Sequence, residues 1–135
     1  MEQTGYGFKI RLNLSFDQAV EKTKARLQHE GFGVLSEIDV KQKLKEKLGK
    51  EFRNYLILGA CHPLSAYQAL SAELEIGLLL PCNVIVYEAE DGAVVSAINP
   101  MEAMKIAANP ELAELAKEVS ARLKTVIANL GDDSP

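Results

Sequence analysis

The side chains best suited to chemistry in this sequence are two cysteines and one histidine. Cys61 and His62 are adjacent and are followed by a proline, while Cys82 itself follows a proline. Thiolate and imidazole groups are common ligands of zinc, copper and other thiophilic metals. If the elements that carry them adjoin, Cys61, His62 and Cys82 make a tentative site for a small ligand or a metal ion. We expect the two cysteines to lie close together with His62 beside them.

The same cysteines allow two other interpretations. Cys61 ends a predicted strand just before a predicted helix, where backbone N–H groups stabilise an anionic thiolate. It is therefore a possible nucleophile of a thiol enzyme or thiol carrier, and Cys82 is a second thiol for the same role or for a redox pair. The third interpretation is structural, because an unpaired cysteine often packs as a small buried hydrophobe. The sequence leaves these alternatives open.

A basic segment is the second candidate site. Six cations gather between positions 41 and 53, opposed there only by Glu46 and Glu51: Lys41, Lys43, Lys45, Lys47, Lys50 and Arg53. The segment is thus net +4 in a chain of net −4, which leaves −8 for the remainder. It could bind an anion or act as an interaction surface, or it could be a solvated helix face with stems over apolar surface. Few aromatic residues accompany it, so nucleic-acid binding is not expected.

Alternation and capping signals predict the elements of the first half. Tyr6–Leu14 alternates apolar and polar residues and predicts a strand. Ser15 and Gln18 form a capping box that begins a helix, which ends near Gly31. Further strands are predicted at Phe32–Val40 and Tyr55–Cys61, with a short helix at Lys41–Gly49 between them. Phe32, Val34, Ile38 and Val40 are predicted to share one face of their strand.

The second half predicts a helix, strands and then helices. Pro63 favours a helix from an N-cap at His62 to about Leu74. Ile76–Leu80 and Cys82–Glu88 read as strands with a bend at Pro81, and Asp91-Gly92 predicts a hairpin to a strand at Ala93–Ile98. Asn99-Pro100 and Asn109-Pro110 begin two helices, the second reaching about Leu130. This order predicts an α+β domain whose five- or six-stranded, mainly antiparallel sheet has helices on one face.

The length and composition set the class of protein. With 135 residues, 47% hydrophobic and 25% charged, residues 1–130 fit one soluble domain that needs no disulfide or metal to fold. The polar residues 131–135 are predicted to be a disordered tail. Two cysteines and no long apolar run predict a cytoplasmic protein without a membrane segment. A small sheet covered on one face also predicts a homodimer, because its other face or an edge strand needs cover.

Four sequence blocks resemble a known family. They are Glu37-Ile38-Asp39-Val40, Leu44-Lys45-Glu46-Lys47-Leu48-Gly49, Leu58-Gly59-Ala60-Cys61-His62-Pro63 and Ile76-Gly77-Leu78-Leu79-Leu80-Pro81-Cys82-Asn83-Val84. Together they resemble the domain of unknown function numbered 302, over about residues 6 to 130. The resemblance implies a fold like half of a TATA-binding protein, with one strand, a helix, four strands and a closing helix, in members that are often dimeric. It implies no activity, and a shared fold is no reason to expect DNA binding.

Overall fold

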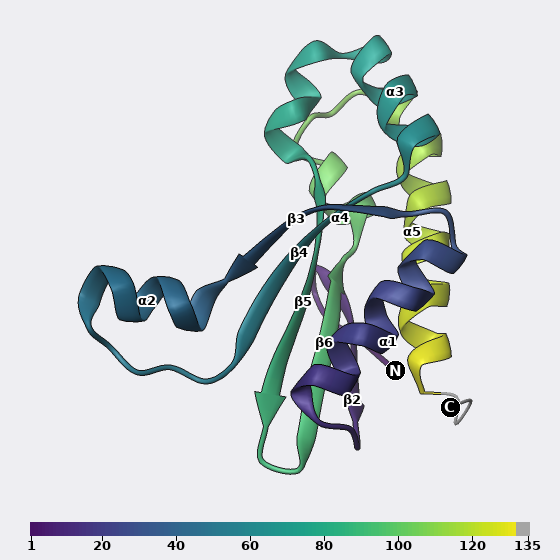
Figure 1. Cartoon of the computed structure of the whole chain (residues 1–135). Coiled ribbons are helices and arrows are strands. Elements are labelled where there is room, and N and C mark those ends of the chain that lie inside the picture. The colour runs from purple at the N-terminus through teal and green to yellow at the C-terminus, as the bar shows by residue number, and fades with distance from the viewer. Residues whose placement is uncertain (132–135) are drawn as a thin grey trace.

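The computed structural model describes residues 1–131 and is organised around one sheet (Figure 1). All neighbouring strands are antiparallel, and the six strands lie in the order β1-β2-β6-β5-β4-β3. Their bounds are β1 Glu2–Gln3, β2 Gly7–Leu12, β3 Gly33–Asp39, β4 Tyr55–Cys61, β5 Cys82–Ala89 and β6 Gly92–Ile98. The predicted α+β class with an antiparallel sheet is therefore confirmed. The predicted tail lies outside the described residues from position 132 onward.

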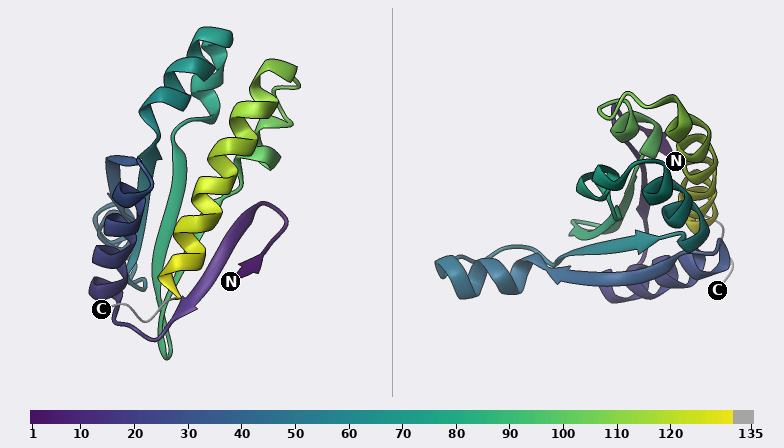
Figure 2. Two further views of the ribbon diagram at one scale, coloured as in Figure 1. Left: turned by 90° about the vertical axis from the view of Figure 1, so that its right-hand side faces the viewer. Right: turned by 90° about the horizontal axis from the view of Figure 1, so that it is seen from above.

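Two long helices cover one face of the sheet. Helix α1 (Phe16–His29) and helix α5 (Pro110–Leu130) contact each other, and both contact β6. Figure 2 shows them side by side on the same side of the strands. Both are amphipathic, and α1 buries Ala19, Val20, Thr23 and Leu27. The predicted β-α-β4-α core is present, with shorter helices inserted between its elements.

The inserted helices are α2 (Val40–Leu48), α3 (Pro63–Ala72), the 3-10 helix η1 (Leu74–Leu79) and α4 (Pro100–Met104). The strand predicted at Ile76–Leu80 is wrong, because η1 occupies most of that range. The apolar run was read as a strand, but it instead packs Ile76 into a small separate cluster with Ala69 of α3 and Leu112 of α5. A short apolar run does not by itself distinguish a strand from a buried helical turn.

The main core lies between the sheet and the two long helices. Leu58, Val84, Val86 and Val95 point into it from the sheet and are almost wholly buried, as are Leu27 and Leu123 from the helices. Among residues 1–131, no helix layer covers the opposite sheet face (Figures 1 and 2). There the rings of Tyr55 and Tyr87 stack with centroids 5.5 Å apart.

Strand β3 is bulged, which corrects the predicted face. Its pairing with β4 shifts between Val34 and Ser36, so that Val34 lies opposite Ala60 but Ile38 lies opposite Ile57. Ala60 faces the core, and Ile57 of the same strand faces away from it because side chains alternate along a strand. Their partners Val34 and Ile38 therefore lie on opposite faces of the sheet. The prediction that they share a face is therefore wrong. The bulge lies at Ser36, the polar residue midway between Val34 and Ile38.

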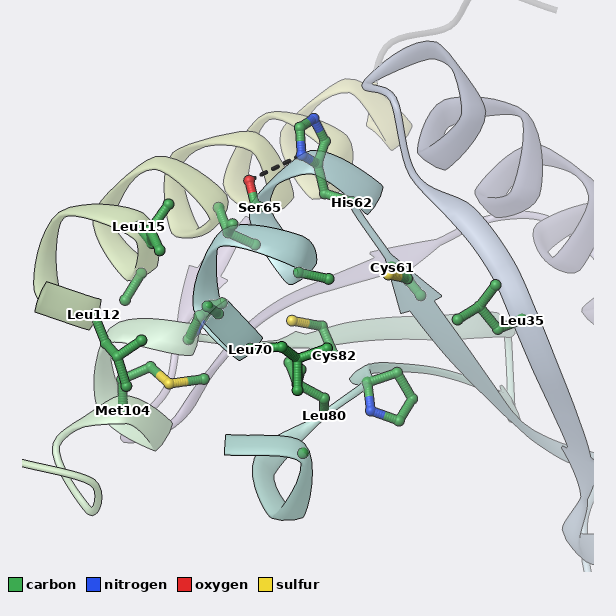
Figure 3. A pocket seen from close by; sticks show the side chains of 18 residues that line it. Leu35, Cys61, His62, Ser65, Leu70, Leu80, Cys82, Met104, Leu112 and Leu115 are labelled. Carbon is green, nitrogen blue, oxygen red and sulfur yellow. Dashed lines mark hydrogen bonds between the residues drawn. The ribbon is translucent and has the colours of Figure 1, made fainter. Parts of the chain in front are cut away.

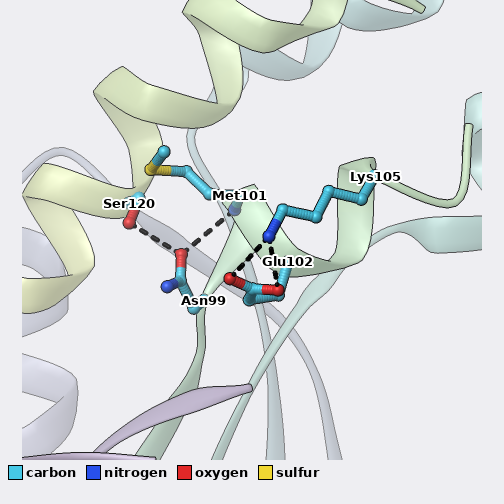
Figure 4. Close-up of polar contacts among 5 residues, drawn as sticks. All are labelled: Asn99, Met101, Glu102, Lys105 and Ser120. Atoms are coloured by element: carbon cyan, nitrogen blue, oxygen red, sulfur yellow. Dashed lines mark hydrogen bonds and ion pairs between the residues drawn. The ribbon is translucent and has the colours of Figure 1, made fainter. Parts of the chain in front are cut away.

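Side-chain caps begin α1, α4 and α5 at the predicted residues. The capping box of Ser15 and Gln18 is formed in both directions. The buried Asn99 accepts from the backbone N–H of Met101 at 3.1 Å and from the Ser120 hydroxyl at 2.8 Å, which ties α4 to α5 (Figure 4). Asn109 caps α5 in the same way, through Glu111 N–H. Among residues 1–131, no helix is both long and apolar enough to cross a membrane.

Candidate functional site

An apolar cavity of about 310 Å³ lies at one end of the sheet, between the main core and the small cluster of α3, η1 and α5 (Figure 3). Its walls come from the ends of β4 and β5, from α3 and η1, and from α4 and α5. Leucine, alanine, proline and methionine side chains dominate these walls, among them Leu70, Leu80, Met104, Leu112 and Leu115. The polar groups on them are the two thiols and the side chains of His62 and Ser65.

Both cysteines line this cavity, although they are not cross-strand partners. Cys82, the first residue of β5, lies opposite Ala60, and Cys61 follows Ala60 as the last residue of β4. Figure 3 shows the two side chains entering the cavity region from the two strand ends. Both thiols are free and only partly exposed. The structure thus places Cys61 and Cys82 in one site.

His62 also lines the cavity, but its imidazole is turned away from the two sulfurs. Its Nδ1 is hydrogen-bonded to the Ser65 hydroxyl at 2.9 Å, and its ring packs edge-on against Phe32 with centroids 5.6 Å apart. In Figure 3 the imidazole points away from the two sulfurs and toward the start of α3. His62 is the N-cap residue of α3, as predicted, but its side chain makes no capping bond. It therefore links the start of α3 to Phe32, the residue that directly precedes β3.

This orientation bears on the metal hypothesis. Within residues 1–131, no group of three or more His, Cys, Asp and Glu side chains is arranged to hold a metal ion. The three ligands expected from the sequence are therefore not assembled into a zinc or copper site in the part of the chain that is described. Adjacency in sequence misled here because consecutive residues at a strand end point to different sides.

The pKa values of the two cysteines also argue against a reactive thiolate at this site. Burial raises the pKa of Cys82 to about 11, with a smaller contribution from the nearby Cys61. Burial also raises the pKa of Cys61. Both thiols are thus protonated at neutral pH, whereas cysteine nucleophiles depend on a lowered pKa and a nearby positive charge. The arrangement favours a neutral, apolar site over thiol catalysis.

The sequence did not reveal most of the cavity wall. Leu70, Leu80, Met104 and Leu112 come from α3, the end of η1, α4 and α5, and no local motif joins them. One signal was available in the sequence. The apolar run Ile76–Leu80 directly precedes Cys82, which implies that apolar side chains surround that thiol.

The basic segment forms a separate, exposed feature on α2 and the loop after it. Lys41 donates to the Phe52 carbonyl at 2.8 Å, and Lys45 pairs with Glu51 at 3.1 Å. Lys43 lies 3.6 Å from Glu46. Alternate residues of a helix lie on different sides of it, so the four lysines of α2 do not converge on one point. This part of the chain resembles a charged surface more than an enclosed anion site.

The fold and cavity together define an α+β protein with an apolar cavity at the end of its six-stranded sheet. Residues 8–130 match the family model described as "Domain of unknown function DUF302", and the chain belongs to this family. A solved relative is the "uncharacterized conserved protein DUF302 from Bacillus stearothermophilus". Its crystal structure is 28% identical, with a TM-score of 0.85 over 93% of this chain and 98% of that chain. No curated protein matches.

Proposed function

We propose that this protein binds a small, largely apolar molecule in the cavity at the end of its sheet. The observation that carries the proposal is the apolar wall of the cavity, to which strands and helices from both halves of the chain contribute. Ligand pockets typically occupy about 300–1,000 Å³ and have mainly apolar walls with a few polar groups. The cavity, at about 310 Å³, lies at the small end of that range.

The size and chemistry of the wall limit the ligand. At roughly 30 Å³ for each water-sized group, the cavity holds about ten non-hydrogen atoms. Charged side chains are absent from its lining. A charged ligand would therefore lose its hydration without gaining a partner, which costs several kcal/mol. The ligand class that fits is a neutral molecule, or the neutral end of a longer one.

The two thiols give the wall its selectivity. A protonated thiol is a weak hydrogen-bond donor with a polarizable sulfur. Cys61 and Cys82 would thus contact the ligand without reacting with it. This role fits the raised pKa of both thiols. The ligand site expected from the sequence is thus proposed again at the two cysteines, while His62 holds the start of α3 in position through Ser65 and Phe32.

Binding of a neutral fluorescent probe tests the proposal. 1-Aminonaphthalene is close to the size that the cavity holds and its fluorescence shifts to shorter wavelengths in apolar surroundings, so we expect a saturable shift with the native chain. Ala66→Phe places a ring at the cavity wall and should weaken probe binding at least tenfold. The matched control is Ala121→Phe on the exposed face of α5, outside the lining. Equal binding by both variants, with unchanged circular dichroism, would reject the cavity as the site.

A further inference from the structure

A second hollow adjoins the apolar cavity. This space, which we call the outer hollow, measures about 440 Å³ and lies between α4 and the first turns of α5. Alanine, proline and methionine side chains dominate its walls, and the polar residues among them are Lys105 and Asn109. Met104 and Ala116 line both the cavity and the outer hollow. The two spaces therefore meet at one methionine and one alanine.

The shared part of the wall is made of adaptable and small side chains. Met104 is the last residue of α4, and Figure 3 shows it beside Leu112 at one end of the cavity. It is partly buried against the small cluster that includes Leu112. A methionine side chain has three rotatable bonds and adapts to irregular space, whereas Ala116 contributes only a methyl group. A change of side-chain rotamer at Met104 would join the two spaces without movement of a helix.

The polar groups of the outer hollow are already paired with one another. The Lys105 ammonium lies 3.0 Å from the Glu102 carboxylate (Figure 4). Asn109 accepts from the Glu111 N–H at 2.9 Å and donates to the Glu73 carboxylate at 2.9 Å. An anionic group here would have to displace Glu102 from Lys105. A hydroxyl group, in contrast, can donate to Glu102 and accept from Lys105 with the ion pair intact.

We infer that the ligand is a neutral single-chain amphiphile, a straight alkyl chain with a hydroxyl-type headgroup. Its chain fills the cavity and passes Met104, and its headgroup lies in the outer hollow beside Lys105 and Glu102. This inference rests on the proposed function and names the class of ligand. The joined space is more than twice that of the cavity alone, so it admits a chain longer than about ten non-hydrogen atoms.

Displacement of 1-aminonaphthalene by a series of 1-alkanols tests the inference. Each CH₂ group that leaves water raises the affinity about fourfold. A chain confined to the cavity would stop gaining affinity near octan-1-ol, because the cavity holds only about ten non-hydrogen atoms. We expect the gain to continue to dodecan-1-ol, and dodecan-1-ol to bind at least tenfold more tightly than dodecanoate at neutral pH.

The outcomes separate this inference from the proposed function. A gain that stops near octan-1-ol would overturn the joined space and leave the cavity as a ligand site. Equal affinities for dodecan-1-ol and dodecanoate would overturn the neutral headgroup. A native chain that does not bind the probe at all would instead contradict the proposed function.

Substitutions on α5 test the route of the chain. Ala113→Phe places a ring in the outer hollow from an exposed position. It should abolish the gain beyond octan-1-ol and leave the affinity for hexan-1-ol unchanged. Ala121→Phe makes the same change outside both linings and is the matched control, which should keep the full gain. The same chain-length dependence in both variants, with unchanged circular dichroism, would show that the chain leaves the cavity elsewhere and would overturn the inference.

Discussion

Cys82 lies opposite Ala60 in the β4–β5 ladder, yet it shares a cavity with Cys61, the residue that follows Ala60. The cavity lies at the strand ends, where the regular alternation of faces stops because α3 follows β4 and η1 precedes β5. Two thiols can therefore meet in one site without being cross-strand partners. This relationship leads to a prediction about each thiol.

Alkylation of Cys82 should be slow and strongly pH-dependent. A thiol with a pKa of about 11 is mostly protonated at pH 8, and only its thiolate reacts. In a Cys61→Ser protein, iodoacetamide labelling of Cys82 should rise about tenfold per pH unit from pH 8 to 10. Mass spectrometry of the labelled chain measures this rate. A rate at pH 8 equal to that of a model peptide thiol would show that the thiol is not desolvated.

Stability should fall between about pH 9 and pH 11 because of the same thiol. The folded pKa of Cys82 is above its unfolded value, so the folded state holds more protons in this window. Stability therefore decreases as pH rises, by at most about 1.4 kcal/mol per pH unit for one group. Urea unfolding of the native chain and of Cys82→Ala checks this. The variant should lose part of the slope, and an identical slope in both would contradict the prediction.

Replacing Asn99 should lower the free energy of unfolding more than is usual for a side chain of its size. It caps α4 and accepts from Ser120 in a buried position, so Asn99→Ala removes a cap and leaves the Ser120 hydroxyl without this partner. We expect a loss of about 2–3 kcal/mol in the free energy of unfolding. Ser120→Ala removes both the hydroxyl and its need for a partner, and should cost about 1 kcal/mol. Urea titrations rank the two, and a larger loss for Ser120→Ala would contradict this account.

Two glycines with positive φ should respond differently to alanine. Gly92 in the β5–β6 hairpin has φ 150°, and a Cβ there would overlap the carbonyl oxygen of Leu12. Gly49, the left-handed C-cap of α2, has φ 65° and open space around the same position. Gly49→Ala should thus cost about 1 kcal/mol, from backbone strain alone. Gly92→Ala should cost clearly more, and equal melting temperatures for the two variants would refute the steric argument.

The elements were predictable where local chemistry decides them. Ser15, Asn99 and Asn109 cap helices by hydrogen bonds within three residues, so the sequence alone locates these helix starts. The hairpin predicted at Asp91-Gly92 is present, but its turn lies one position earlier, because Ala89 pairs with Gly92 and the two turn residues are therefore Glu90 and Asp91. The apolar run Ile76–Leu80 was predicted wrongly because its conformation depends on α3 and α5, which pack on it from distant parts of the chain.

The site was predictable only in its thiols. Cys61 and Cys82 were identified by residue type, but the leucines that surround them come from four separate elements. The direction of His62 depends on Ser65 and Phe32, one within its own helix and one 30 positions earlier in the sequence. Side-chain direction at a strand end follows from such tertiary contacts, which no spacing of residues encodes.

Methyl NMR of the leucines in the presence of 1-aminonaphthalene is the most direct test of the ligand site. Leu70, Leu80, Leu112 and Leu115 line the cavity together with Leu35 of β3, Leu123 lies in the main core, and Leu48 is exposed on α2. We predict that the probe shifts the methyl signals of Leu70, Leu80, Leu112 and Leu115 and leaves those of Leu123 and Leu48 in place. Shifts confined to the exposed leucines, or none at saturating probe, would contradict the central claim that this cavity binds an apolar molecule.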